Sequence, residues 1–145
     1  MITVERNALV GHSAARLYAL VEDVESYPAF LPWCAAAEVR ARDGPQVVVT
    51  LRIRFHGVRQ QFTTRNTLVA GERIEMALVE GPFRRLDGVW RFVPLGADAC
   101  RVELRIDYEL GSPLLARAVG PTFDQIANTL VDAFVRRADA LHGAA

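Results

Sequence analysis

Apolar residues recur at helical spacing along the last part of the chain, residues 112–141. The face that they form consists of Leu115, Val119, Phe123, Ile126, Leu130, Phe134 and Leu141. Most charged residues fall on the opposite side, which is typical of a helix that packs one face against a sheet. Ser112 is a favourable cap for the start of this helix, and Gly143 suits its end.

Gly120 and Pro121 interrupt this pattern, because proline removes a backbone donor and its ring clashes with the preceding turn. The residues that follow, 122–125, have the form of a new capping box. We therefore expect a short helix over 113–119, a kink, and a main helix over about 122–141.

Alternation of apolar and polar residues marks five segments in the middle of the chain. They are residues 47–55, 58–70, 74–80, 86–92 and 100–110, and short turns such as His56-Gly57 separate them. Alternation with one polar side is typical of antiparallel strands that expose one face to water. Short turns also make neighbours in sequence neighbours in the sheet.

The first part of the chain is less regular. Residues 2–10 are predicted to form a strand, Ser13 can cap a short helix over 14–21, and 23–26 form a turn or a further helical turn. The segment 27–34 carries two prolines among its aromatic residues, so it is neither a regular helix nor a central strand. It is either a portal for an apolar ligand or a plug that closes the core, and the pattern leaves both open.

These elements predict a single α+β domain over residues 1–145. A curved antiparallel sheet of about seven strands wraps around the long C-terminal helix, and two short helices follow the first strand. Such a sheet encloses more volume than one helix fills. Either side chains fill that volume as an ordinary core, or a small apolar molecule occupies it.

The composition of the chain excludes some classes of function. Hydrophobic residues make up 51% of the chain, and the 17 basic residues, all arginine, balance 17 acidic ones. This excludes a disordered chain and a strongly basic nucleic-acid-binding tail. The N-terminus does not resemble a leader, no apolar run reaches membrane-spanning length, and the two cysteines show no metal or disulfide pattern. We expect a cytoplasmic protein.

No group of residues has the spacing of a catalytic or metal site. His12, His56 and His142 fall at a helix start, a turn and a helix end, where we expect solvated side chains. Cys34 has no sequence partner that would activate it as a nucleophile. We therefore expect no enzymatic activity, no metal and no cofactor.

Two motifs resemble those of a known family. The first is Asp23-Val-x-x-Tyr-Pro-x-Phe-Leu-Pro-Trp-Cys34, and the second is Gly81-Pro-Phe-x-x-Leu-x-Gly-x-Trp-x-Phe92. Together with Phe134-x-x-Arg-Ala138 in the final helix, they resemble the signatures of the coenzyme Q-binding START-domain proteins. That family includes bacterial ribosome association toxins and belongs to a wider polyketide cyclase-like group.

The resemblance implies a helix-grip fold with a hydrophobic cavity. It also implies non-catalytic binding of ubiquinone or another polyprenyl lipid in support of respiration, with transient contact at the inner membrane as a corollary. The alternative that it implies is a toxin that binds the large ribosomal subunit and blocks subunit association.

The candidate ligand-binding residues come from the proline-rich segment, the inward strand positions and the apolar face of the terminal helix. They are Phe30, Leu31, Trp33, Met76, Leu78, Phe83, Trp90, Tyr108, Phe123, Ile126 and Leu130. Tyr108 is either the polar group for a ligand carbonyl or a core tyrosine with its hydroxyl at the rim of the sheet, and the pattern leaves both open. An apolar tail would dominate the affinity, because each buried CH₂ contributes roughly 0.8 kcal/mol.

Arginines at outward strand positions are the candidate contacts for ribosomal RNA. They are Arg52, Arg54, Arg65, Arg91 and Arg105. Such side chains can neutralise phosphates, but acidic residues such as Glu75 and Glu103 share that face and could pair with them instead. Whether the arginines lie apart from the acids or interleave with them distinguishes the two interpretations.

Overall fold

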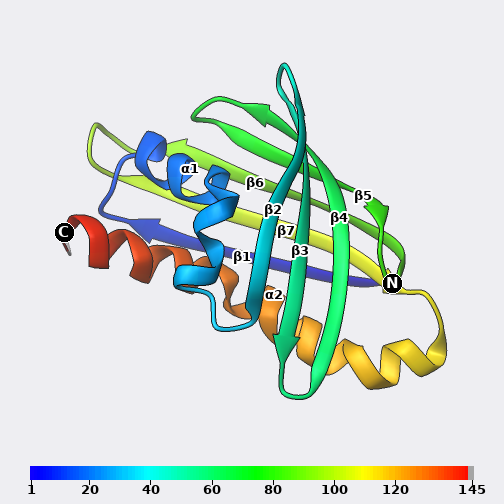
Figure 1. The fold of residues 1–145 in the computed structure, drawn as a ribbon. Coiled ribbons are helices and arrows are strands. Elements are labelled where there is room, and N and C mark those ends of the chain that lie inside the picture. The colour runs from blue at the N-terminus through cyan, green and yellow to red at the C-terminus, as the bar shows by residue number, and fades with distance from the viewer. Residues whose placement is uncertain (144–145) are drawn as a thin grey trace.

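The computed structural model describes residues 1–143, which form a seven-stranded antiparallel sheet, two α-helices and a 3-10 helix (Figure 1). In chain order the elements are β1 (Ile2–Val10), α1 (Ala14–Glu22), η1 (Val24–Ala29), β2 (Cys34–Asp43), β3 (Gln46–Phe55), β4 (Val58–Val69), β5 (Arg73–Glu80), β6 (Phe83–Pro94), β7 (Cys100–Leu110) and α2 (Pro113–His142). The strands lie in the order β1-β7-β6-β5-β4-β3-β2. Strands β2 to β7 therefore form a meander, and β1 pairs with its end.

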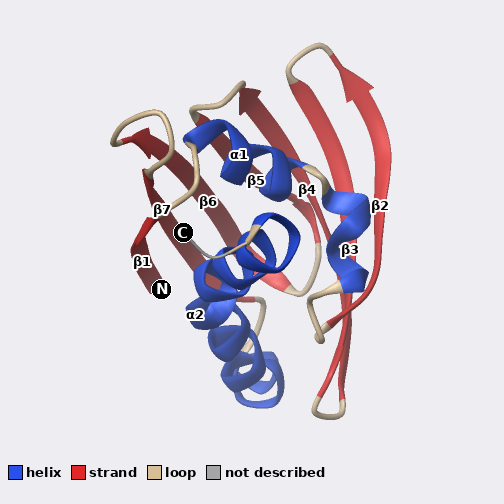
Figure 2. Ribbon diagram, turned by 90° about the vertical axis from the view of Figure 1, so that its left-hand side faces the viewer, coloured by secondary structure: helices blue, strands red, loops and turns tan. Residues whose placement is uncertain are grey.

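The sheet curls around α2, and α1 and η1 lie on the same side of the sheet as α2 (Figure 2). This is the predicted α+β, helix-grip arrangement, and the prediction is confirmed. Among the described residues, no helix combines the length and the apolar character needed to cross a membrane.

The inner face of the sheet follows the predicted alternation. On β7 the inward residues are Cys100, Val102, Leu104, Ile106, Tyr108 and Leu110, and all are buried. The apolar face of α2 packs against this surface, with Phe134 and Trp90 meeting edge to face at a centroid distance of 5.4 Å. Burying each large apolar side chain contributes roughly 1.5–3 kcal/mol, so this contact holds the helix in the grip of the sheet.

The predicted break in the terminal helix is wrong. α2 runs without interruption from Pro113 to His142, with Pro121 inside it. Pro121 lies on the exposed side of the helix. Water can hydrate the carbonyl that loses its intrahelical hydrogen bond there, and the packed inner face compensates for the weakened turn.

Both predicted ends of α2 are confirmed. The Ser112 hydroxyl accepts a hydrogen bond from the N–H of Leu115 at 3.1 Å. Gly143 ends the helix with a φ of 83°, a conformation that suits glycine. Leu141, which the pattern placed on the apolar face, is exposed. The last buried position of that face is Ala138, so the final turn extends past the core.

Strand β2 has no counterpart among the five alternating segments. Its register shifts between Cys34 and Ala36 and again between Val39 and Ala41. Each irregularity changes which face the following residues occupy, so the sequence shows no simple alternation there. Residues 24–29 form the 3-10 helix η1, which agrees with the further helical turn that was one of the two alternatives for 23–26.

His12 is buried, which corrects the prediction of a solvated side chain. Its Nε2 lies 2.7 Å from Asp139 Oδ1, and Arg16 lies 3.2 Å from its Nδ1. Arginine can only donate, so Nδ1 accepts from Arg16 and Nε2 donates to the carboxylate. This chain of bonds fastens the start of α1 to the last turns of α2.

Candidate functional site

An internal cavity of about 80 Å³ lies between the inner face of the sheet and α2. Its walls come from η1, the loop before β2, strands β3 to β7, and α2. The lining residues are Val24, Tyr27, Trp33, Val49, Leu51, Ile53, Phe62, Thr64, Asn66, Met76, Leu86, Gly88, Trp90, Ile106, Phe123, Ile126, Ala127 and Leu130. Most of these side chains are apolar, which is typical of a site for a hydrophobic molecule.

The structure brings some of the predicted ligand-binding residues together in this cavity. The predicted residues that line it are Trp33, Met76, Trp90, Phe123, Ile126 and Leu130. The others lie outside its lining: Leu31 and Phe83 are buried in the surrounding core, Phe30 and Leu78 are half-buried, and Tyr108 lies behind Phe123.

The proline-rich segment closes one wall of the cavity. Tyr27 and Trp33 line it, and Leu31 is 1% exposed. The Arg137 guanidinium lies over the ring of Phe30, 5.0 Å from its centroid, which ties this segment to α2. In the present conformation the segment is therefore a plug and not an open portal.

Tyr108 is separated from the cavity by a cluster of aromatic rings. Its ring meets Phe123 at a centroid distance of 4.7 Å and Phe83 at 6.2 Å. Its hydroxyl is fully buried and makes no hydrogen bond within the described part of the chain. Burial, with a smaller contribution from the carboxylate of Asp124, raises the pKa of Tyr108 to about 12.

The polar groups of the cavity are Thr64 and Asn66, which the sequence analysis did not single out. Both are buried, and the Thr64 hydroxyl donates to Asn66 Oδ1 at 2.8 Å. They share the inward parity of Phe62 on β4, since alternate residues of a strand face the same side. The sequence could have revealed these two residues, because polar side chains are unusual at the inward positions of a strand.

The cavity offers little for acid–base or nucleophilic chemistry. No Asp, Glu, His, Arg or Cys belongs to its lining among the residues described. Burial raises the pKa of the neighbouring Cys34 thiol to about 11, which disfavours the reactive thiolate. No cluster of three or more His, Cys, Asp or Glu residues suited to a metal ion occurs within residues 1–143.

The outer face of the sheet carries the predicted RNA-contact residues, and all five are exposed. Arg105 interleaves with acids: its guanidinium lies 3.2 Å from both Glu5 and Asp107. The other four predicted arginines make no ion pair with any described residue. The face therefore combines paired and unpaired arginines.

A curved sheet that holds a long terminal helix over an apolar cavity defines the helix-grip class of domains. The family described as polyketide cyclase / dehydrase and lipid transport matches residues 10–135, and the chain belongs to it. A START superfamily protein from Mycobacterium smegmatis has the same fold, with a TM-score of 0.78 at 24% identity, covering 96% of this chain and 98% of that one.

Two relatives place the chain more narrowly. It is 44% identical to the ribosome association toxin RatA of Pseudomonas aeruginosa over 140 residues, which is 97% of each chain. It is 25% identical to the mitochondrial coenzyme Q-binding protein COQ10 homolog B of Xenopus laevis, covering 98% of this chain and 60% of that protein. The family resemblance seen in the sequence motifs is thus confirmed.

Proposed function

We propose that this protein binds the large ribosomal subunit and blocks subunit association in the cytoplasm. The observation that carries the proposal is the 44% identity, along nearly the whole chain, to a protein named ribosome association toxin RatA. The exposed arginines of the outer sheet face support it, because ribosomal RNA presents phosphates that guanidinium groups bind well. Of the two functions that the sequence motifs imply, the comparisons favour this one.

Sedimentation with isolated subunits tests the proposal. We expect the protein to pellet with large subunits and not with small ones, and to dissociate as salt rises. Adding it to a mixture of both subunits under conditions that favour joining should lower the fraction of joined ribosomes. A protein that stays in the supernatant with both subunits at low salt would refute the proposal.

The cavity supports a second candidate function, the binding of a hydrophobic ligand such as a prenylquinone. Its apolar lining suits the tail, and the Thr64–Asn66 pair could serve a carbonyl of the head. At about 80 Å³ the cavity is smaller than the roughly 300–1,000 Å³ of ordinary ligand sites. Binding therefore requires half-buried side chains such as Met76 and Leu130 to move outward.

Native mass spectrometry with added ubiquinone tests this candidate. Thr64→Val removes a cavity hydroxyl with little change of shape, and Thr63→Val makes the same change one residue away on the opposite face of β4. We expect several-fold weaker binding in the first variant only, because the Thr64 hydroxyl donates to Asn66 Oδ1 and so orients the amide that would donate to the ligand carbonyl. Wild-type protein that takes up no ubiquinone would remove this candidate.

We propose that the protein acts by binding and not by catalysis. The family description includes cyclases and dehydrases, so the fold alone does not decide the point. The absence of Asp, Glu, His, Arg and Cys from the lining of the cavity, among the described residues, supports a binding role. Incubation with a bound ligand should therefore return the ligand unchanged.

A further inference from the structure

Positive charge is concentrated in one hairpin of the sheet. Residues 44–71, which contain β3, β4 and the turns at either end, include no acidic residue. Their arginines are Arg52, Arg54, Arg59 and Arg65. Because the whole chain has 17 basic and 17 acidic residues, the remaining parts carry four more acids than arginines. Although the net charge of the chain is zero, residues 44–71 therefore form a basic hairpin.

Two arginines of the basic hairpin face each other without counter-ions among the described residues. Arg54 and Arg59 are directly opposite in the register of β3 and β4, and all four arginines are exposed. The Arg52 guanidinium donates to Gln61 Oε1 at 3.3 Å, and no arginine of the hairpin makes an ion pair with a residue in the described range 1–143. Like charges opposite each other destabilise a sheet, so an external anion is the natural partner.

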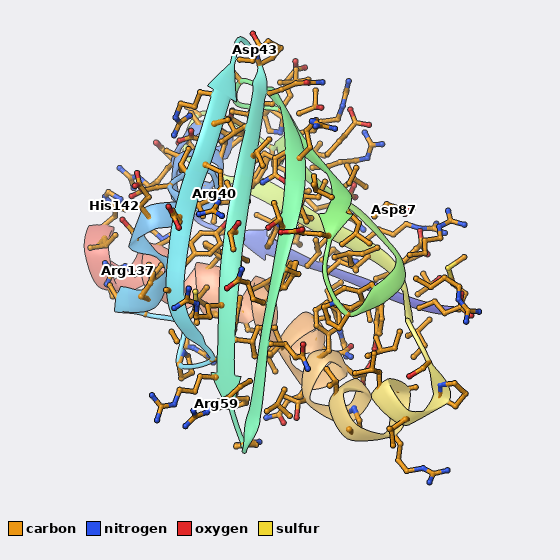
Figure 3. All side chains as sticks on the ribbon, turned by 45° about the vertical axis from the view of Figure 1, so that its right-hand side comes forward. Arg40, Asp43, Arg59, Asp87, Arg137 and His142 are labelled. Atoms are coloured by element: carbon orange, nitrogen blue, oxygen red, sulfur yellow. The ribbon has the colours of Figure 1, made fainter. Side chains whose placement is uncertain are left out.

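The rest of the outer face is different. On β5 to β7 the arginines mostly lie beside acids, in the pairs Arg73–Glu75, Arg85–Asp87, Arg101–Glu103 and Arg105–Asp107. Figure 3 shows Arg59 at the lower end of the hairpin and Asp87 well apart from it, toward the right of the view. Apart from Arg91 on β6, the arginines of the outer face that make no ion pair with a described residue therefore lie on β3 and β4.

We infer that the basic hairpin is the surface that binds the phosphate backbone of RNA, which rests on the ribosome-binding function proposed above. Guanidinium groups pair with phosphate oxygens through two parallel hydrogen bonds, and neighbouring strands present them to several phosphates together. A membrane surface would also attract the charge, but it is bound together with inserted apolar side chains. No large apolar residue is exposed in residues 44–71.

A matched pair of double variants tests the inference. Arg54→Glu with Arg59→Glu reverses the facing pair of the hairpin. Arg117→Glu with Arg136→Glu reverses two exposed arginines of α2 that make no ion pair with a residue in the described range. Both variants reverse two unpaired arginines and change the net charge equally, so they differ in where the charge lies. Circular dichroism and thermal melting check that both remain folded.

Binding is measured with large ribosomal subunits and with deproteinised ribosomal RNA between 50 and 200 mM salt. We expect the hairpin variant to bind both at least tenfold more weakly. The slope of log affinity against log salt should fall by about two, one for each lost phosphate contact. The control variant should keep nearly the wild-type affinity and slope. Equal losses in the two variants would overturn the inference.

The two probes separate this inference from the proposed function. Wild-type protein that binds ribosomal RNA through the hairpin but ignores subunits would leave the inference standing and remove the proposed function. Subunit binding that is unchanged in the variant Arg54→Glu with Arg59→Glu would overturn the inference and leave the proposed function standing. Binding to vesicles containing phosphatidylglycerol that is lost in this variant, with RNA binding unchanged, would also overturn the inference.

Discussion

Replacing Tyr108 by phenylalanine should stabilise this protein, whereas the same change at Tyr27 should destabilise it. The Tyr108 hydroxyl is fully buried without a hydrogen-bond partner at bonding distance among residues 1–143, so only its weaker interaction with the Asp124 carboxylate offsets the loss of water. Removing it should raise the free energy of unfolding by about 1–3 kcal/mol. For a chain of this size, each kcal/mol raises the melting temperature by about 2–4 °C.

Tyr27 is the matched control, because it is also buried but its hydroxyl donates to the backbone carbonyl of Val21. Tyr27→Phe leaves that carbonyl unsatisfied and should lower the free energy of unfolding by roughly 1–3 kcal/mol. Urea unfolding monitored by fluorescence measures both variants, with equal m-values confirming that the unfolded states are comparable.

Alkaline pH provides a second readout of the same hydroxyl. Its pKa is raised to about 12 in the folded protein, against about 10 in the unfolded chain. Between these values the unfolded chain has released the proton while the folded protein retains it, so stability should fall as pH rises from about 10 to 12. Tyr108→Phe should weaken this pH dependence.

A loss of stability in Tyr108→Phe as large as that in Tyr27→Phe would refute the reasoning. It would mean that the Tyr108 hydroxyl is hydrogen-bonded in solution, with Asp124 as the acceptor to examine, since its carboxylate already raises the pKa of this tyrosine.

Three further predictions concern single substitutions, each measured by urea unfolding. Arg59→Glu turns the facing repulsion with Arg54 into attraction and should stabilise by about 0.2–1 kcal/mol while weakening RNA binding; a loss of stability would contradict it. Gly81→Ala should cost about 1–3 kcal/mol, because its φ is 155° and a Cβ would lie 2.6 Å from the Cβ of Phe62; a neutral effect would show that β4 can shift. His12→Ala should cost about 1–3 kcal/mol through the lost bonds to α1 and α2, and an unchanged midpoint would refute a fastening role.

Periodicity predicted the parts of this fold that depend on burial alone. The alternation on β7 was correct at every inward position because one face meets the core and the other meets water. The His56-Gly57 turn followed from local chemistry, since both residues adopt positive φ in a two-residue hairpin. Each of these features is determined by a few neighbouring residues.

The errors arose where contacts between distant residues decide the outcome. Pro121 would end an isolated helix, but the packed face of α2 keeps it continuous. His12 is buried only because Asp139, more than a hundred residues later, closes over it. Likewise, parity placed Tyr108 on the inward face correctly but could not show that Phe123 separates it from the cavity.

The order of the elements, with α2 after all seven strands, has a consequence for the order of folding. The inner face of the sheet lacks its largest apolar partner until residues 113–142, which form α2, have been made. A chain that emerges from its N-terminus can pair its hairpins early but cannot complete the core. The cavity is therefore the last feature of the fold to form, because α2 supplies one of its walls.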